Sequence, residues 1–243
     1  MTLKKASDGV NHKILMDKLE FYGNEGRFKS LIKSYLTGQC QKVTLKNNNI
    51  NITSFSKREL IKNGVPQGSI LGPLYFLLYI NDLPKASTKN NSLVLFADDT
   101  SLLITDFNNS DFNININQSF HNTISLFNNN LLTLTFTKTH YVEFRTKNYY
   151  HIKTKVKYEH KNISNSSETK FLGLIIDETL SWNQHTDHIA TNLCSACYAL
   201  RNLKHTVPQS TLRTIYYAHI HSILSYGIIF WGRSSNVNKL FIL

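Results

Sequence analysis

The sequence predicts an α/β domain that ends near Leu180, followed by a small helical domain. Three observations support this fold class. Short apolar runs rich in β-forming residues alternate with segments whose apolar residues recur every three or four positions, which are strand and helix patterns. From Asn183 onward only the helical pattern remains. With 243 residues, of which 41% are hydrophobic, the chain is long enough to bury the core of such a fold.

The first part of the chain predicts two helices and a hairpin. Residues 12–22 place apolar side chains on one helix face and are followed by Gly23, which suits a helix end. Residues 26–36 show the same pattern and stop before Gly38. Residues 41–46 and 50–55 alternate across an Asn-rich turn, which predicts a hairpin with a basic face.

A loop rich in Gly and Pro, Asn63-Gly-Val-Pro-Gln-Gly-Ser69, precedes a predicted apolar helix over residues 70–80. Such a loop places little side-chain bulk in the way of a ligand, and Ser69 can cap the helix that follows. Free backbone amides at a helix start favour phosphate binding. A plain turn before a buried helix is the alternative interpretation of this segment.

Two adjacent acids, Asp98 and Asp99, lie between two apolar runs that are each too short for an ordinary helix. The pattern predicts a hairpin with both acids in its turn, since consecutive side chains along a strand point to opposite faces. Two close carboxylates repel each other unless a cation lies between them, and Mg²⁺ prefers such oxygen ligands. An ordinary Asp-rich turn is the alternative.

The next segments predict a helix over residues 111–128 and mostly alternating strands over 131–144 and 149–158. The second of these strands carries Lys153, Lys155 and Lys157 on one face. That face is either a track for nucleic acid or a solvated edge that prevents aggregation.

The remainder predicts a buried strand and two helices. The strand covers residues 170–176, and the helices cover 184–205 and 209–225. The first helix contains His185, His188, Cys194 and Cys197, whose spacings are similar to those of zinc ligands. The alternative interpretation is an ordinary amphipathic helix with small buried cysteines.

The charge balance points to a polyanionic partner. Lys and Arg number 27 against 16 Asp and Glu, which gives a net charge of +11. Nucleic acid is the leading candidate and an anionic membrane surface the alternative. No apolar run is long enough to span a bilayer, and no signal-peptide core follows Met1, so we expect a soluble, intracellular protein without a membrane partner. Three cysteines are too few for a disulfide framework.

Several motifs in the same order resemble the reverse transcriptases of non-LTR, LINE-like and Jockey-like retrotransposons. The strongest are Gly64-Val-Pro-Gln-Gly-Ser69, Tyr79-Ile-Asn-Asp-Leu-Pro84 and Phe96-Ala-Asp-Asp-Thr100. The resemblance covers essentially the whole chain. Further matches are Val10-Asn-His-Lys-Ile-Leu15, Lys138-Thr139, Phe171-Leu-Gly173 with Ser181-Trp182, and residues 226–232.

The resemblance implies a ferredoxin-like polymerase palm over residues 1–180, with the fingers largely absent. A helical thumb and the start of a truncated C-terminal segment would follow over 181–243. The implied activity is RNA-directed DNA polymerisation, a nucleotidyl transfer that uses two Mg²⁺ ions, or Mn²⁺ in their place. The implied partners are an RNA template, a DNA primer, their RNA–DNA hybrid and deoxynucleoside triphosphates.

The same resemblance implies roles for individual residues. Asp98 and Asp99 correspond to catalytic, metal-binding acids. The residues that correspond to a primer grip are Phe171, Leu172 and Gly173. Those that correspond to contacts with the nucleotide and the template are Gly64, Pro66, Gln67, Gly68 and Lys138.

The N-terminal segment departs from the family pattern. Relatives carry a segment like Asp-Leu-Ser-Lys-Ala-Phe-Asp, and this chain has Thr2-Leu-Lys-Lys-Ala-Ser-Asp8. Thr2 therefore replaces the third metal-binding acid, and Ser7 replaces the aromatic gate against the sugar 2′-hydroxyl. We expect a truncated copy of the transposable element with impaired catalysis. A non-catalytic, nucleic-acid-binding remnant is the alternative, so enzyme activity stays open. A telomerase, an intron maturase or a viral RNA polymerase fits the motifs less well.

Overall fold

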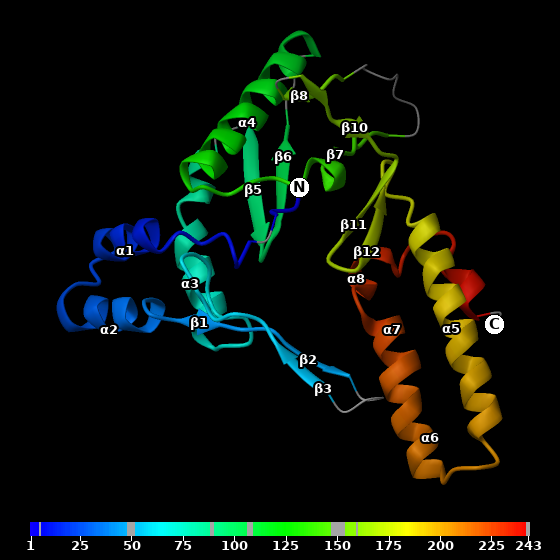
Figure 1. The fold of residues 1–243 in the computed structure, drawn as a ribbon. Helices are drawn as coiled ribbons and strands as arrows, with labels where there is room; N and C mark the ends of the chain where they lie inside the picture. The colour runs from blue at the N-terminus through cyan, green and yellow to red at the C-terminus, as the bar shows by residue number, and fades with distance from the viewer. Residues whose placement is uncertain are drawn as a thin grey trace. The chain divides into compact units, whose positions relative to one another are not determined.

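The computed structural model describes residues 1–4, 6–47, 52–87, 90–105, 109–146, 154–158 and 160–241. These residues form two compact units (Figure 1). The first unit is Met1–Thr139 with Ile152–Ile163, and the second unit is His140–His151 with Ser164–Leu243. Both mix helices with short strands, which confirms the predicted α/β class. The division differs from a single boundary near Leu180, because strands before that residue group with the C-terminal helices.

The helices of the first unit begin and end within a few residues of their predicted positions. The side chain of Asn11 caps α1, because its Oδ1 accepts hydrogen bonds from the backbone N–H groups of Lys13 and Ile14 at 3.0 and 3.1 Å. Ser69 stabilises the start of α3 as predicted, since its hydroxyl oxygen accepts from the N–H of Gly72 at 2.9 Å. The helices are α1 (His12–Phe21), α2 (Gly26–Leu36), α3 (Leu71–Ile80), the 3₁₀ helix η1 (Leu83–Ala86) and α4 (Asn109–Asn129).

The named strands of the first unit pair as antiparallel two-stranded sheets. Among them, β2 and β3 form the predicted basic hairpin, although residues 48–51 of its turn lie outside the described residues. The pairs are β1 (Cys40–Gln41) with β4 (Glu59–Leu60), β2 (Thr44–Asn47) with β3 (Ile52–Phe55), β5 (Asn91–Phe96) with β6 (Asp99–Ile104), and β8 (Lys157–Tyr158) with β9 (Lys161–Asn162).

Helix α4 supplies much of the core of the first unit. It runs beside the β5–β6 hairpin (Figure 1), and the Nδ2 of Asn91 in β5 donates to the hydroxyl of Ser119 at 2.8 Å. The hydroxyl of Tyr79 in α3 donates to the carbonyl of Asn130 just beyond α4, at 2.5 Å. These contacts hold the two helices and the hairpin together. The buried residues on the predicted apolar face of α4 are Ile116, Phe120, Ile124 and Phe127.

The predicted strand over residues 131–144 is wrong as a continuous element. It contains a single bridge at Leu134, the 3₁₀ helix η2 (Phe136–Lys138) and the short strand β7 (His140–Tyr141). The hydroxyl of Thr139 donates to the carbonyl of Thr135 at 3.0 Å, and such a local bond competes with strand pairing. Of the predicted strand over 149–158, residues 149–153 lie outside the described residues, Lys153 among them.

The second unit contains strands followed by helices. The predicted single strand over 170–176 is instead the antiparallel hairpin of β11 (Glu168–Phe171) and β12 (Leu174–Asp177), because Leu172 and Gly173 have φ of 46° and 84° and turn the chain. β7 pairs in parallel with β10 (Ser164–Asn165). The helices are α5 (Asn183–Leu203), α6 (Gln209–Tyr216), the π-helical η3 (Tyr217–His221), α7 (Ser222–Ser225), α8 (Ile228–Trp231) and the 3₁₀ helix η4 (Val237–Phe241).

A small hydrophobic core and a buried carboxylate hold the second unit together. The core consists of Leu174, Ile189, Leu193, Trp231 and Leu240. The buried carboxylate of Asp177 accepts hydrogen bonds from the N–H groups of Thr179, Ser181 and Trp182 at 2.7–3.0 Å. Burial raises the pKa of Asp177, but these hydrogen bonds outweigh burial and hold the pKa below its ordinary value. The carboxylate therefore serves the structure, since it fixes the turn before α5.

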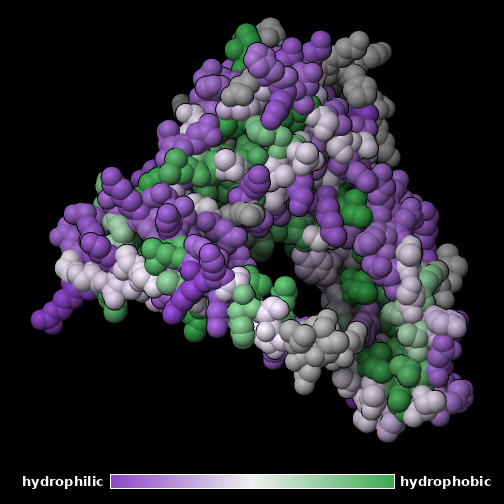
Figure 2. All heavy atoms as spheres, viewed as in Figure 1, coloured by the Kyte–Doolittle hydropathy of each residue, from purple (hydrophilic) through white to green (hydrophobic). Residues whose placement is uncertain are grey.

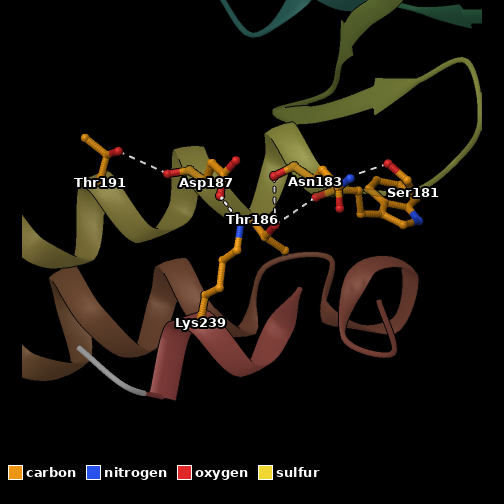
Figure 3. Close-up of polar contacts among 7 residues, drawn as sticks. Ser181, Asn183, Thr186, Asp187, Thr191 and Lys239 are labelled. Atoms are coloured by element: carbon orange, nitrogen blue, oxygen red, sulfur yellow. Dashed lines mark hydrogen bonds and ion pairs between the residues drawn. The ribbon is translucent and has the colours of Figure 1, made fainter. Parts of the chain in front are cut away.

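Further polar contacts follow the first turns of α5 (Figure 3). The hydroxyl of Thr186 donates to the carbonyls of Trp182 and Asn183 at 3.0 and 2.8 Å. Lys239 of η4 forms an ion pair with Asp187 at 3.2 Å. Because both of these side chains are more than half exposed, the ion pair contributes at most about 1 kcal/mol. The core residues, rather than this pair, hold η4 against α5.

The surface is mainly hydrophilic on the face shown in Figure 2, where hydrophobic residues show in separate places. The most exposed large hydrophobic side chains of the described residues are Ile70 in the first unit and Ile229 in the second, at 93% and 85%. None of the described helices combines the length and the apolar character needed to cross a membrane.

Candidate active site

The two adjacent acids lie at the tip of the β5–β6 hairpin, one residue out of the predicted register. Phe96 pairs with Asp99, so the two-residue loop consists of Ala97 and Asp98, and Asp99 is the first residue of β6. The turn was predicted at Asp98 and Asp99, but Ala97 takes the positive φ of 50°. Both acidic residues are exposed. The hairpin therefore presents two adjacent carboxylates to solvent.

The N-terminal segment pairs with this hairpin and brings Thr2 beside Asp99. The N–H of Leu3 donates to the carbonyl of Asp98 at 3.0 Å, and the N–H of Thr100 donates to the carbonyl of Met1 at 2.8 Å. Between these two backbone bonds, the Thr2 hydroxyl donates to Oδ1 of Asp99 at 3.1 Å. A neutral hydroxyl thus lies against one of the two carboxylates.

A pocket of about 420 Å³ lies between the acidic hairpin and the loop rich in Gly and Pro. Asp98 and Ala97 line it from the hairpin. The predicted residues Ser7, Pro66, Gln67 and Gly68 also line it, together with Ala6, Val65, Gly72, Pro73 and Phe76. The structure therefore brings one of the two acids together with most of the predicted nucleotide-contacting loop.

Backbone contacts with residues 7–12 hold the loop in place. The N–H of Gly64 donates to the carbonyl of Val10 at 2.7 Å. Gly64 has a φ of 89°, and a Cβ there would lie 2.9 Å from Cα of Asp8, so only glycine fits this close approach. Nε2 of His12 forms a hydrogen bond of 2.7 Å with the Gly64 carbonyl.

One side-chain contact in the loop was not predicted from the sequence. Nε2 of Gln67 donates to Oδ1 of Asp8 at 3.0 Å. A carboxylate only accepts hydrogen bonds, so this contact orients the Gln67 amide with its nitrogen toward Asp8. The two residues are 59 positions apart, and no local pattern signals their contact.

Lys138 does not line the pocket. It is exposed at the end of η2, which follows Thr135 directly. The N–H of Thr135 donates to the carbonyl of Thr2 at 2.9 Å. Lys138 therefore belongs to the segment that pairs with residues 2–4, on the edge opposite the one that pairs with β6.

Phe171, Leu172 and Gly173 lie in the second unit, at the tip of the β11–β12 hairpin. The hydroxyl of Tyr226 donates to the carbonyl of Leu172. A Cβ on Gly173 would lie 3.2 Å from Cε1 of the same tyrosine ring. The predicted primer grip is thus a tight turn that Tyr226 supports.

The spacing of His185, His188, Cys194 and Cys197 in α5 is similar to that of zinc ligands. His185 is buried between the rings of Trp182 and Trp231, with centroid distances of 6.0 and 5.8 Å, and its Nδ1 accepts the N–H of Ile175 at 3.3 Å. The described residues contain no group of three or more His, Cys, Asp or Glu side chains placed to hold a metal ion.

Comparison with known protein families identifies the class of protein to which the chain belongs. The family model for reverse transcriptase (RNA-dependent DNA polymerase) matches residues 1–176. This match covers more than half of the chain. The chain therefore belongs to the reverse transcriptase family.

Two curated relatives from Drosophila melanogaster support the predicted type of element. The "probable RNA-directed DNA polymerase from transposon BS" is 26% identical over 99% of this chain and 27% of the relative. The "probable RNA-directed DNA polymerase from transposon X-element" is 26% identical over 83% of this chain and 22% of the relative. The predicted resemblance to the reverse transcriptases of non-LTR elements is confirmed. The chain spans about a quarter of the length of these relatives.

Proposed function

We propose that this chain is the palm and thumb part of a non-LTR retrotransposon reverse transcriptase with impaired polymerase chemistry. Residues 1–180 correspond to the ferredoxin-like palm, although residues 164–180 group with the C-terminal helices, and residues 181–243 correspond to the helical thumb. The substrates are deoxynucleoside triphosphates, and the partners are an RNA template with a DNA primer. The first unit contains the pocket where the nucleotide binds.

The observation that carries this proposal is the contact between Thr2 and Asp99. Thr2 occupies the position of the third acid, and its hydroxyl donates to Asp99 at 3.1 Å. A hydroxyl is neutral, whereas a carboxylate adds a full negative charge beside a cation. Two metal ions and a triphosphate are therefore held in register less firmly than in a site with three acids. The fold and the nucleotide pocket persist while the charge of the site is reduced.

The two remaining acids suit a divalent cation. Reverse transcriptases use divalent metal ions, and Mg²⁺ is commonly bound by one or two carboxylates together with substrate phosphates. The carboxylates of Asp98 and Asp99 are exposed, and both are hard oxygen donors. They would hold the ion, with Mn²⁺ as a substitute for Mg²⁺. When bound, such an ion offsets the negative charge of the phosphates and lowers the pKa of an attacking hydroxyl.

The pocket suits a nucleotide. Its volume of about 420 Å³ lies within the range of roughly 300–1,000 Å³ that small-molecule sites occupy. Gln67 and Gly68 line it from the loop, and the orientation of the Gln67 amide is set by Asp8. Ser7 replaces an aromatic gate, so we expect any synthesis to discriminate poorly against ribonucleotides.

A second candidate function is a non-catalytic, nucleic-acid-binding remnant of the element. The same hydroxyl at Thr2 favours it, because a site without its third acid can lose chemistry without losing the fold. The net charge of +11 favours retained binding to phosphate backbones. The two candidates differ only in whether any templated synthesis remains.

Primer extension on an RNA template tests the proposal. We expect little or no extension by the unmodified chain, because losing a ligand that stabilises the transition state by several kcal/mol costs about a thousandfold or more in rate. Any residual extension should disappear in Asp98→Asn and persist in Asp17→Asn, which removes an exposed charge on α1. Robust templated incorporation that Asp98→Asn abolishes would show that catalysis is intact.

Binding of Mn²⁺, followed by paramagnetic relaxation of water protons, tests the acid pair separately. The double change Asp98→Asn with Asp99→Asn should abolish binding, whereas Asp17→Asn should leave it unchanged. Thr2→Asp should tighten it about tenfold, which corresponds to about 1.4 kcal/mol for an added carboxylate. Binding that survives the double change would place the ions elsewhere.

A further inference from the structure

The hairpin of β8 and β9 and the helix η2 carry exposed lysines beside an aromatic cluster. None of these residues belongs to the motifs that line the pocket. We call this surface the lysine hairpin. Its members all come from the first unit, and one of its cations, Lys161, lies over the ring of Phe136. The lysines are Lys138, Lys155, Lys157 and Lys161, and the rings are Phe136 and Tyr158.

The segment that contains β8 has hydrogen-bond partners for its backbone on both edges, and these partners lie in the first unit. On one side β8 pairs with β9, and the N–H of Ile163 donates to the carbonyl of Val156 at 3.0 Å. On the other side Asn117 of α4 accepts from the N–H of Lys157 at 2.9 Å and donates to the carbonyl of Lys155 at 3.0 Å. Lysines that guard an open strand edge are needed only where the edge is unpaired. Edge protection therefore does not explain Lys155 and Lys157.

The lysine side chains are exposed, and the acids of the described residues do not pair with them. Val156 is buried between the exposed Lys155 and Lys157, as the alternation of a strand requires. None of the four lysines forms an ion pair with another described residue. In the sequence of residues 154–163, three lysines and His160 stand against the single acid Glu159. This stretch of sequence therefore carries an excess of positive charge.

The aromatic cluster fixes one of these cations in place. The ring of Tyr158 stacks on Phe136 with a centroid distance of 5.6 Å and an interplanar angle of 16°. Nζ of Lys161 lies 4.5 Å from the centroid of the Phe136 ring. Phe120 of α4 packs edge-on against Tyr158 at 6.3 Å and ties the cluster to the core. A cation held on a packed ring loses less freedom when it binds an anion than a free lysine does.

We propose that the lysine hairpin binds the phosphate backbone of a nucleic-acid strand, independently of base sequence and of the nucleotide pocket. Four cations without an ion pair among the described residues match a polyanion, and the contacts are to phosphates rather than to base edges. Phe136 directly follows Thr135, whose N–H bonds to Thr2, so a strand held here is bound to the same unit as the pocket. The inference rests on the proposed function only in that both require the chain to bind nucleic acid.

The test compares two triple variants of the chain that remove the same charge. One is Lys155→Gln with Lys157→Gln and Lys161→Gln, and the control is Lys13→Gln with Lys33→Gln and Lys62→Gln, three exposed lysines outside this hairpin. The probe is fluorescently labelled oligo(U) RNA, titrated over a series of salt concentrations. We expect the hairpin triple to lower the slope of log affinity against log salt by about 2, because each lost phosphate contact on a single strand is worth about 0.7. The control should change the slope by less than about 0.5.

A Lys→Arg triple at the three hairpin positions should retain the affinity and the slope of the unmodified chain, since it keeps the charge. Unchanged far-ultraviolet circular dichroism shows that each variant is folded. Equal losses of RNA affinity and slope in the hairpin and control triples would mean that binding follows net charge. That result would overturn this inference but not the proposed function. A loss of affinity in the Arg triple would also overturn this inference. If the unmodified chain binds no RNA, the nucleic-acid-binding part of the proposed function fails with it.

Discussion

Two hairpins of the described part of the chain, β5–β6 and β11–β12, turn through a two-residue loop that holds a residue other than glycine at positive φ. In β5–β6 this residue is Ala97, with φ of 50°, and in β11–β12 it is Leu172, with φ of 46°. Such a residue costs about 1–3 kcal/mol, so surrounding contacts must hold it. The two hairpins belong to different units, and they meet this requirement in different ways.

The β11–β12 turn uses its polar groups within the protein. The Tyr226 hydroxyl donates to the Leu172 carbonyl, and the indole of Trp231 donates to the Tyr226 carbonyl at 2.9 Å. The β5–β6 turn is held by the backbone bond from Leu3 to Asp98, while its carboxylates stay exposed. The comparison shows that a strained turn stabilises the fold where neighbouring side chains form hydrogen bonds with its polar groups, as Tyr226 does with Leu172. In the β5–β6 hairpin backbone bonds hold the turn, and the carboxylates remain exposed to a ligand, with the Thr2 hydroxyl on Asp99 as their side-chain contact.

The largest effect is expected from Gly173→Ala, which attacks the supported turn. Gly173 has a φ of 84°, and the added Cβ would lie 3.2 Å from the Tyr226 ring. We expect the second unit to lose about 2 kcal/mol of unfolding free energy. Urea denaturation followed by tryptophan fluorescence measures this unit specifically, because both tryptophans of the chain, Trp182 and Trp231, lie in it.

A double-mutant cycle separates the two causes of that loss. In a Tyr226→Leu background the ring is gone, so Gly173→Ala should cost only the backbone strain. A smaller loss in this background would show that the tyrosine supports the turn. Equal losses in both backgrounds would show that Tyr226 contributes nothing to it.

A smaller effect is expected from lowering the pH. Protonation of His185 should reduce the unfolding free energy of the second unit, because His185 contacts the same hairpin. Burial lowers the pKa of His185 below its ordinary value of 6.5, and the nearby His188 lowers it further. The neutral ring accepts the N–H of Ile175 in β12 through Nδ1, and the protonated ring cannot accept it. The buried Nε2 has no hydrogen-bond partner among the described residues. The folded unit therefore disfavours the charged form.

The sign of the pH dependence follows from the lowered pKa. Above pH 6.5 the histidine is neutral in both states, and its contribution to stability is fully present. As the pH falls from there through the folded-state pKa, the unfolded chain binds the proton first, so the unfolding free energy decreases. Urea denaturation between pH 7.5 and 5 measures this, and His185→Gln should flatten the decrease. An equally steep decrease in His185→Gln would assign the acid sensitivity to other groups.

The helices were predictable from the sequence, whereas the turns were not. The apolar positions of α1, α2 and α4 recur with the helical period, and all three helices form where predicted. The strand predicted over 170–176 overlooked that Gly173 can turn the chain within an apolar run. The Ala97–Asp98 loop was predicted one residue late, because Asp is a common turn residue and Ala rarely takes positive φ.

The candidate site was predictable only as separate motifs. The acid pair and the loop of residues 63–69 were recognisable because each is contiguous in sequence. Their assembly depends on pairing between distant segments, such as Thr2 with Asp99, which are 97 positions apart. The contact of Asp8 with Gln67 is of the same kind. Local patterns contain no information about such pairing. The expectation that the acid pair and the loop belong to one site came from the order of the family motifs.

The smallest effect is expected from Ala97→Gly, which relaxes the acidic turn. Glycine removes the cost of positive φ at Ala97 but adds conformational entropy to the unfolded chain, worth about 0.5–1 kcal/mol in the opposite direction. The β5–β6 hairpin should therefore gain less than about 1 kcal/mol, seen as slower amide exchange of residues 91–104 by mass spectrometry. Ala6→Gly is the control, because Ala6 lines the same pocket without positive φ and should only lose stability. Faster amide exchange in Ala97→Gly would mean that Ala97 adopts its positive φ without strain. The two turns would then differ only in the contacts of their polar groups.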